Sequence, residues 1–221
     1  KRLKNLRPHH IAVIFLFVGI TFTYFSPILE GKKLSAHDTK TWQGASKEVR
    51  DFRNLTGEEA LWTNSMFSGM PAYQISTKSK ANLIQYVAKF IRLGIPRPAD
   101  ILFLYLLGFY ILLLSLKVDY RLSAVGAIAF AFSSYFFIII QAGHMTKAHA
   151  IAYVPMVIAA VLYTYRGKML LGGVLTALTV ALELYANHLQ ITYYLVLILL
   201  LLGLVQFIKD LKANNLVDFV K

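Results

Sequence analysis

Acidic, basic and amide side chains gather in three connections between the long apolar segments of this 221-residue chain. A carboxylate can accept a proton, a lysine or histidine cation can bind an anion, and an amide can hold the polar groups of a ligand. Ionisable groups beside a membrane span are costly and usually face a partner, a cavity or a substrate. The three groups are His37 and Asp38; Gln141, His144, Lys147 and His149; and Glu183, Asn187, His188 and Gln190.

The third group has a helical spacing. Glu183, Asn187 and Gln190 stand at i, i+4 and i+7, so they share one face if the helix before them continues that far. We expect Glu183 to pair with Lys147 or with a histidine. Because the three connections lie at the same predicted depth, the sequence predicts one shared hollow at which they meet.

The composition sets the class of protein that must position these groups. The chain is 57% hydrophobic and 15% charged, whereas soluble domains are roughly 45–50% apolar. About 20 helical residues cross the roughly 30 Å of hydrocarbon in a bilayer. The sequence therefore predicts an all-α, polytopic helical membrane protein with about six transmembrane helices. The predicted spans are 11–28, 99–116, 122–140, 150–165, 169–186 and 191–208.

Basic residues mark alternate connections between the predicted spans. Because Lys and Arg are retained on the cytoplasmic side during insertion, the amino terminus is predicted to be cytoplasmic and the segment 29–98 to face outward. This topology accounts for most of the net charge of +12, so nucleic acid is not an expected partner. The predicted cytoplasmic set is Lys1, Arg2, Lys4, Arg7, Lys117, Arg121, Arg166, Lys168, Lys209, Lys212 and Lys221.

The outer segment is patterned rather than linker-like. Apolar residues at spacings of three and four predict amphipathic helices over 42–53 and 81–93. Such helices either lie in the headgroup layer or pack on one another as a small outer domain. Between them, the aromatic residues of 61–73 suit structural packing, a membrane interface or a platform for sugars.

The chain divides into four predicted parts. The first span is longer than the apolar region of a typical signal peptide, which favours an uncleaved helix. The chain has no cysteine, which excludes disulfides and thiolate sites, and it is interpreted as the amino-terminal part of a longer protein. The parts are 1–28, a cytoplasmic amino terminus and first transmembrane helix; 29–98, the outer loop; 99–208, a five-helix transmembrane bundle; and 209–221, a cytoplasmic segment.

Several motifs resemble those of the YfhO family of bacterial membrane proteins, which are related to the GT-C class of polytopic glycosyltransferases. The resemblance covers most of the chain. It implies a multi-pass protein of the bacterial cytoplasmic membrane, with an acidic residue and two juxtamembrane helices in the first outer loop. The matching stretches are 37–39, 46–48, 51–53, 61–73, 143–147 and 187–194.

The resemblance also implies an activity. A family of this kind transfers a sugar from a polyprenyl-phosphate donor, which enters from the bilayer, to an extracytoplasmic glycan or protein acceptor. Asp38 matches the position of the catalytic acid and is the expected general base, which takes the proton of the acceptor hydroxyl. A divalent cation is a possible cofactor.

The other candidate residues receive substrate-binding roles from the same resemblance. A fixed cation stabilises the charge that develops on the departing lipid phosphate. Lys147 and His144 are placed to supply it, with His188 third. Asp38 is expected to face Lys147 and His188 across a cleft. The remaining members of the expected site are Asn187 and Gln190, which hold sugar hydroxyls; Glu183, which orients a histidine or Lys147; and His37 and His149.

Two other classes of function remain open. A transporter or flippase would use Glu183 and the histidines as a proton relay, and it predicts polar residues throughout the membrane and helices broken at the midplane. A noncatalytic scaffold predicts that the acid and the cations lie far apart. A metal bound by the histidines and Asp38 has no recognised spacing behind it, and no phosphate-binding glycine loop is present.

Overall fold

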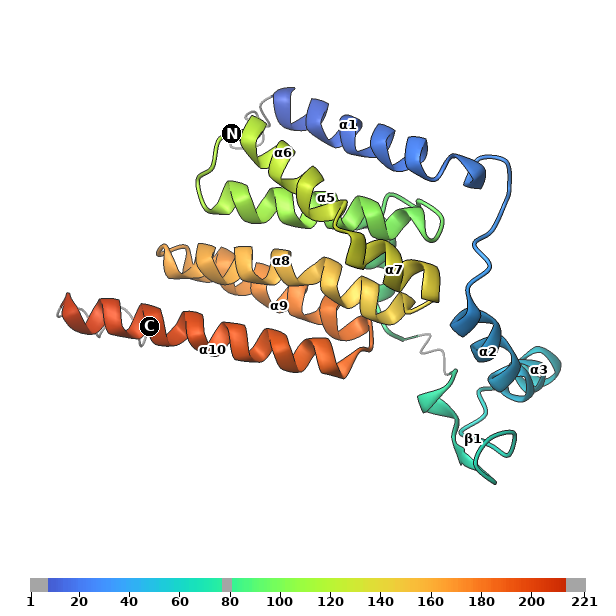
Figure 1. Cartoon of the computed structure of the whole chain (residues 1–221). Coiled ribbons are helices and arrows are strands. Elements are labelled where there is room, and N and C mark those ends of the chain that lie inside the picture. The colour runs from blue at the N-terminus through green and yellow to red at the C-terminus, as the bar shows by residue number, and fades with distance from the viewer. Residues whose placement is uncertain (1–7, 77–80, 214–221) are drawn as a thin grey trace.

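A bundle of long helices carries a smaller lobe beyond one end (Figure 1). The computed structural model describes residues 8–76 and 81–213. The helices of the bundle enclose one apolar core, in which α5 is central and packs on α1, α6 and α8. The bundle comprises α1 (Pro8–Tyr24), α4 (Ile84–Ile91), α5 (Ala99–Ser115), α6 (Tyr120–Ala131), α7 (Ser134–Ala142), α8 (Met145–Tyr165), α9 (Met169–Tyr185) and α10 (Leu189–Lys212).

The predicted helical class is confirmed, and all six predicted spans fall on helices. Two described helices, α8 and α10, are long and apolar enough to cross a membrane, and the bent pair α6 and α7 makes a third if it is one span. The helices α1, α5 and α9 are apolar but have only 17 residues each. Length and composition of the described helices therefore support two to three spans rather than six.

The core is tightest around α5. Every side chain from Ile101 to Leu106 is buried, and the Tyr105 ring stacks on that of Phe136 with 4.3 Å between centroids. Gly108 lets α5 approach α8, since a Cβ there would lie 2.8 Å from the carbonyl oxygen of Ala152. The opposite extreme is α10, which keeps most of its leucines at the surface, as expected of a helix that faces hydrocarbon.

The third predicted span is not one continuous helix. The helices α6 and α7 meet at an angle of 46°. The break lies at Ser133, whose φ of −58° and ψ of 131° are outside the helical region. Serine favours such breaks because its hydroxyl competes for backbone hydrogen bonds. The break could not be predicted from the apolar run 122–140, because hydropathy does not report backbone conformation.

The lobe consists of residues 37–76. The predicted helix 42–53 is in fact two helices, which meet at Ser46. The second predicted helix is shorter than 81–93 and packs on the bundle beside α9, so the two predicted helices do not form one outer domain. The elements of the lobe are α2 (His37–Ala45), α3 (Lys47–Thr56), β1 (Trp62–Thr63), β2 (Met70–Pro71) and the 3-10 turn η3 (Ala72–Gln74).

A carboxylate holds the lobe together. Glu48 on α3 accepts hydrogen bonds from the Thr63 hydroxyl at 2.5 Å and from the backbone amides of Asn64 at 3.0 Å and Ser65 at 2.9 Å. These donors stabilise the ionised form, so they lower the pKa of Glu48, with the Thr63 hydroxyl making the largest contribution. The ionised carboxylate of Glu48 thus links α3 to the segment 63–65.

We expect the lobe to loosen in acid. Because the pKa of Glu48 is depressed in the folded lobe, its contribution to stability is complete above the ordinary value of 4.5 and is lost as the pH falls through the folded value. Hydrogen-exchange protection of the amides of Asn64 and Ser65, corrected for intrinsic rates, should therefore fall below pH 4.5. Glu48→Gln should remove this dependence and Glu58→Gln should keep it. Equal protection at pH 3 and pH 7 would contradict the assignment.

Candidate functional site

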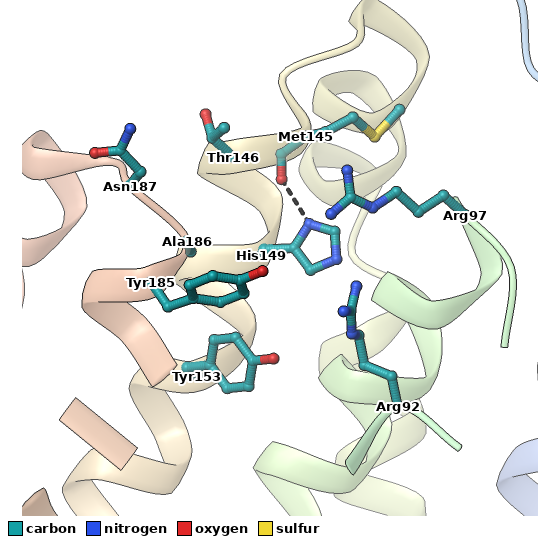
Figure 2. Close-up of a pocket in the computed structure, with 9 residues that line it drawn as sticks. All are labelled: Arg92, Arg97, Met145, Thr146, His149, Tyr153, Tyr185, Ala186 and Asn187. Atoms are coloured by element: carbon teal, nitrogen blue, oxygen red, sulfur yellow. Dashed lines mark hydrogen bonds between the residues drawn. The ribbon is translucent and has the colours of Figure 1, made fainter. Parts of the chain in front are cut away.

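A cavity of about 210 Å³ opens at the lobe end of the bundle. It lies where the connection between α4 and α5 meets the start of α8 and the end of α9. Two arginines approach it from one side, two tyrosines stand on the other, and His149 lies between them (Figure 2). The lining residues are Arg92, Arg97, Met145, Thr146, His149, Tyr153, Tyr185, Ala186 and Asn187.

One buried carboxylate organises the cationic side of this cavity. Asp100, in the first turn of α5, is only 1% exposed. Its Oδ2 lies 3.0 Å from Nη1 of Arg92, 3.1 Å from Nε2 of His149 and 4.0 Å from Nε of Arg97. The Asp100 carboxylate orders the three side chains around it. Because two arginines share one aspartate, this side of the cavity has a surplus of positive charge.

The His149 ring is fixed at both nitrogens. Nδ1 lies 2.9 Å from the carbonyl oxygen of Met145, and Nε2 faces Asp100. A carbonyl oxygen only accepts, so Nδ1 must donate to it. With the Asp100 carboxylate at Nε2 as well, the ring is held in one orientation between α5 and α8.

The chain reverses between the two arginines, and this places both beside the cavity. Arg92 follows the last residue of α4, and its Nε donates to the carbonyl oxygen of Ala88 at 3.0 Å. Leu93 and Gly94 then take positive φ values of 53° and 67°, which turn the chain back toward α5. Arg97 keeps 61% of its side chain exposed, so it has donors free for a ligand.

A side-chain contact between Asp38 and His144 joins the lobe to the bundle. Oδ2 of Asp38 lies 2.9 Å from Nδ1 of His144, and Oδ1 lies 3.5 Å from Nδ1 of His37. Asp38 stands in the first turn of α2, and His144 precedes α8 directly. The next two residues along the chain, Met145 and Thr146, line the cavity. His144 is therefore next to the lining of the cavity along the chain, and we refer to the Asp38–His144 pair as the rim, although neither residue lines the cavity.

Gly143 permits this contact. It has a φ of +97°, and a Cβ on it would lie 2.9 Å from Cβ of Ala36 and 3.1 Å from the amide nitrogen of Thr39. Glycine is needed on both counts, because other residues are strained at this φ and because the start of α2 rests on the bare α-carbon.

Gly143→Ala is expected to separate the lobe from the bundle. The substitution adds backbone strain of about 1–3 kcal/mol and a clash with the start of α2, so hydrogen exchange of α2 should speed up. Gly167→Ala is the matched control, because Gly167 also has a positive φ, +79°, but has nothing within 4 Å of the added carbon. If both variants leave α2 equally protected, the close approach at Gly143 does not hold the lobe.

Two further candidate residues lie beside the cavity. Nδ1 of His188 is 3.4 Å from Oγ1 of Thr146, and Nε2 is buried with no partner among the described residues. Burial lowers the pKa of His188, and the nearby charges of Lys147 and His144 lower it further. The neutral ring can form hydrogen bonds but supplies no charge at neutral pH. Lys147 does not line the cavity, and its Nζ lies 5.5 Å from the centroid of the Tyr135 ring.

The predicted common face of Glu183, Asn187 and Gln190 is wrong. Helix α9 ends at Tyr185, and Asn187 adopts a positive φ of 57°, which breaks the i, i+4, i+7 relation. Asn187 lines the cavity, whereas Gln190 is exposed and donates to the Tyr194 hydroxyl at 2.9 Å.

The expected pairing of Glu183 with Lys147 or a histidine is also wrong. Glu183 is fully buried, and the hydroxyl of Thr192 on α10 lies 3.0 Å from each of its carboxylate oxygens. No ion pair of Glu183 is found in the described part of the chain. Its side chain joins α9 to α10 and does not orient the site.

The structure thus gathers part of the predicted set and adds to it. His149 and Asn187 line the cavity, and Asp38 and His144 meet at its rim. Sequence reasoning missed the residues that give the cavity its charge and its aromatic wall. Their signal was a pair of arginines just before an aspartate at the start of a predicted span. The missed residues are Arg92, Arg97, Asp100, Tyr153 and Tyr185.

Over residues 8–76 and 81–213, no group of three or more His, Asp or Glu side chains could hold a metal ion. No protein-family model, curated protein or solved structure matches the chain. The family resemblance therefore rests on the sequence motifs.

Proposed function

We propose that this chain is a GT-C-type membrane glycosyltransferase of the YfhO kind, which moves a sugar from a polyprenyl-phosphate donor to an acceptor on the outer side of the bacterial cytoplasmic membrane. One observation supports this most strongly: a cavity with surplus positive charge adjoins the Asp38–His144 pair at one end of an apolar helical bundle. An anionic donor and a proton acceptor would meet there.

The proposal includes six membrane crossings. The described start of α1 and the described end of α10 both lie at the end of the bundle away from the lobe (Figure 1). An even number of crossings with a cytoplasmic amino terminus agrees with this arrangement. Helices of 17 residues are about 25 Å long, which is at the short end of the spanning range. The proposed topology places the lobe and the cavity outside.

The donor phosphate is assigned to the arginine pair. Planar guanidinium groups match phosphate oxygens with two parallel hydrogen bonds. Asp100 holds Arg92 in place, while Arg97 is exposed enough to reach a ligand. Lys147 and His144, the cations expected from the sequence, lie outside the lining of the cavity and contribute at longer range.

Asp38 is assigned the role of general base. As the acceptor hydroxyl oxygen bonds to C1 of the sugar, its proton passes to the carboxylate of Asp38, and the C1–oxygen bond to the lipid phosphate breaks. Polyprenyl phosphate leaves with the negative charge, which the arginines stabilise. His144 orients Asp38 at 2.9 Å, and Asn187 is placed to bind sugar hydroxyls.

The test is transfer by the protein in proteoliposomes that contain a panel of radiolabelled polyprenyl-phosphate sugars and cell-envelope acceptor fractions. We expect one donor to lose its label to an acceptor with release of an equal amount of polyprenyl phosphate. Parallel reactions with a chelator report whether a divalent cation assists. Intact donors throughout the panel would contradict the proposed function.

A transporter or flippase is the second candidate, and the break between α6 and α7 favours it. A helix broken near its middle is typical of transporter binding sites. However, the residues at this break, Phe132 and Ser133, carry no charge, and the charged groups of the cavity lie at one end of the bundle. Movement of a labelled lipid-linked sugar across the bilayer without breakage of its C1 bond would establish this alternative.

A further inference from the structure

The hairpin of the lobe exposes large aromatic side chains on an uncharged stretch. Residues 60–76 contain no Asp, Glu, Lys or Arg, although the chain as a whole carries a net charge of +12. Trp62 is 56% exposed, Phe67 83% and Tyr73 65%. A lobe built only for its own packing would bury such rings, because each has a large apolar surface.

Trp62 is both rigid and exposed. It lies on β1, opposite Pro71 of β2. Its indole rests against Gly69, where an added Cβ would lie 2.8 Å from Nε1 and 2.9 Å from Cζ2. The neighbouring Thr63 is buried and bonded to Glu48, which fixes the strand beneath the ring. The ring is therefore held in place while more than half of the side chain faces solvent.

The tip of the hairpin is strained. Phe67 and Ser68 have φ values of 51° and 58°, in the left-handed region that disfavours bulky side chains. The exposed Phe67 ring regains little of this cost by packing. Strained residues of this kind occur at ligand-binding positions, where the strain presents a side chain to its ligand.

We propose that Trp62 and Phe67 form a platform for a neutral glycan built of pyranose units. The flat, C–H-bearing face of a pyranose stacks on an aromatic ring, and Asn64 and Ser68, which are exposed and close to these residues in the chain, offer hydrogen bonds to hydroxyl groups. The absence of charge at 60–76 suits a neutral ligand. The claim that Trp62 and Phe67 bind a glycan does not depend on the proposed function. The further claim that this glycan is the acceptor of the transferase does depend on it.

The bilayer is the competing occupant, and the structure disfavours it. A hairpin that docks on an anionic membrane combines apolar rings with Lys and Arg, and residues 60–76 have neither basic residue. The lobe also lies beyond one end of the helical bundle (Figure 1), not along its sides.

The test measures binding of cellotetraose and chitotetraose to the full chain in nanodiscs by saturation-transfer NMR and titration calorimetry, with no donor present. We expect one of the two to bind, and Trp62→Ala to weaken binding roughly tenfold. Phe67→Asn should weaken binding similarly without loss of thermal stability, because asparagine tolerates the left-handed region. Phe67→Tyr should bind like the wild type, as should Tyr86→Ala, which removes an exposed aromatic from α4.

Three results would overturn the platform. The first is the absence of binding to either oligosaccharide. The second is undiminished binding by Phe67→Asn, a variant that does not risk unfolding the hairpin. The third uses the lack of cysteine in the chain: a fluorophore on Phe67→Cys that brominated phospholipids quench, but aqueous iodide does not, would place the tip in the bilayer. Since no donor is present, failure of sugar transfer would leave a positive binding result intact.

Discussion

Asp38→Asn is expected to abolish sugar transfer while leaving expression and membrane insertion unchanged. The amide cannot accept the proton of the acceptor hydroxyl, and loss of a general base typically costs about 10²–10⁴-fold in rate. The side-chain oxygen of the new amide would still reach His144, so the lobe should keep its place on the bundle. Initial rates with the labelled donor in proteoliposomes, at matched protein content, measure the effect.

Asp51→Asn is the control for this change. Asp51 is an exposed carboxylate of the same lobe that pairs with Lys47, four residues earlier on α3. The substitution removes one negative charge without touching the rim of the cavity, and the transfer rate of this variant should match that of the wild type. Near-normal turnover by Asp38→Asn would remove Asp38 from the catalytic role, whatever the outcome for the control.

Arg97→Gln should raise the KM for the polyprenyl-phosphate donor by about 10–100-fold, since a hydrogen bond to a charged group contributes about 1.5–3 kcal/mol. Arg97 is 61% exposed, so the change should affect folding little. Arg97→Lys should recover only part of the loss, because an ammonium group cannot form the paired bonds of a guanidinium group. Titration of the donor at fixed acceptor concentration separates KM from kcat.

Arg121→Gln is the matched control for the donor experiment. Arg121 is an exposed arginine at the start of α6, where it lies over the Tyr120 ring and away from the cavity. The KM of this variant should stay within error of the wild type. If Arg97→Gln instead raises the KM for the acceptor and spares the donor, the cavity binds the acceptor rather than the lipid phosphate.

The sequence predicted the helices well because long apolar runs in this chain have few ways to satisfy their backbone except as helices. Whether each predicted helix is continuous or broken was harder to predict. Ser133 and Ser46 each lie at a break between two helices and directly precede the second, and a single serine carries a weak signal in either setting. The split of the third span and of the first amphipathic helix therefore had to come from the structure.

The sequence predicted that polar connections far apart in the chain would approach one another. It did not predict the side-chain relations that depend on the backbone conformation of a single residue. The approach of the segment 29–98 to the turn before α8 was expected from the polar residues of both, and Asp38 does lie against His144. The cleft expected between Asp38 and the pair Lys147 and His188 is not found in the described part of the chain, since none of the three residues lines the cavity.

The common face of Glu183, Asn187 and Gln190 was not predictable, because it depended on whether α9 continues through Asn187, whose left-handed conformation ends that relation. Arg92 and Arg97 were not singled out, because they were counted together with the other basic residues of the segment 29–98.

The contact at Gly143 has a consequence for which substitutions the chain can tolerate during evolution. The Asp38–His144 contact joins two separately packed units, the lobe and the bundle, and the bare α-carbon of Gly143 lies against the start of α2 where they meet. If the proposed function holds, substitutions can accumulate on the surface of the lobe without rebuilding the interior of the bundle. One added methyl group at Gly143 would then disturb the proposed base and the proposed phosphate site at once.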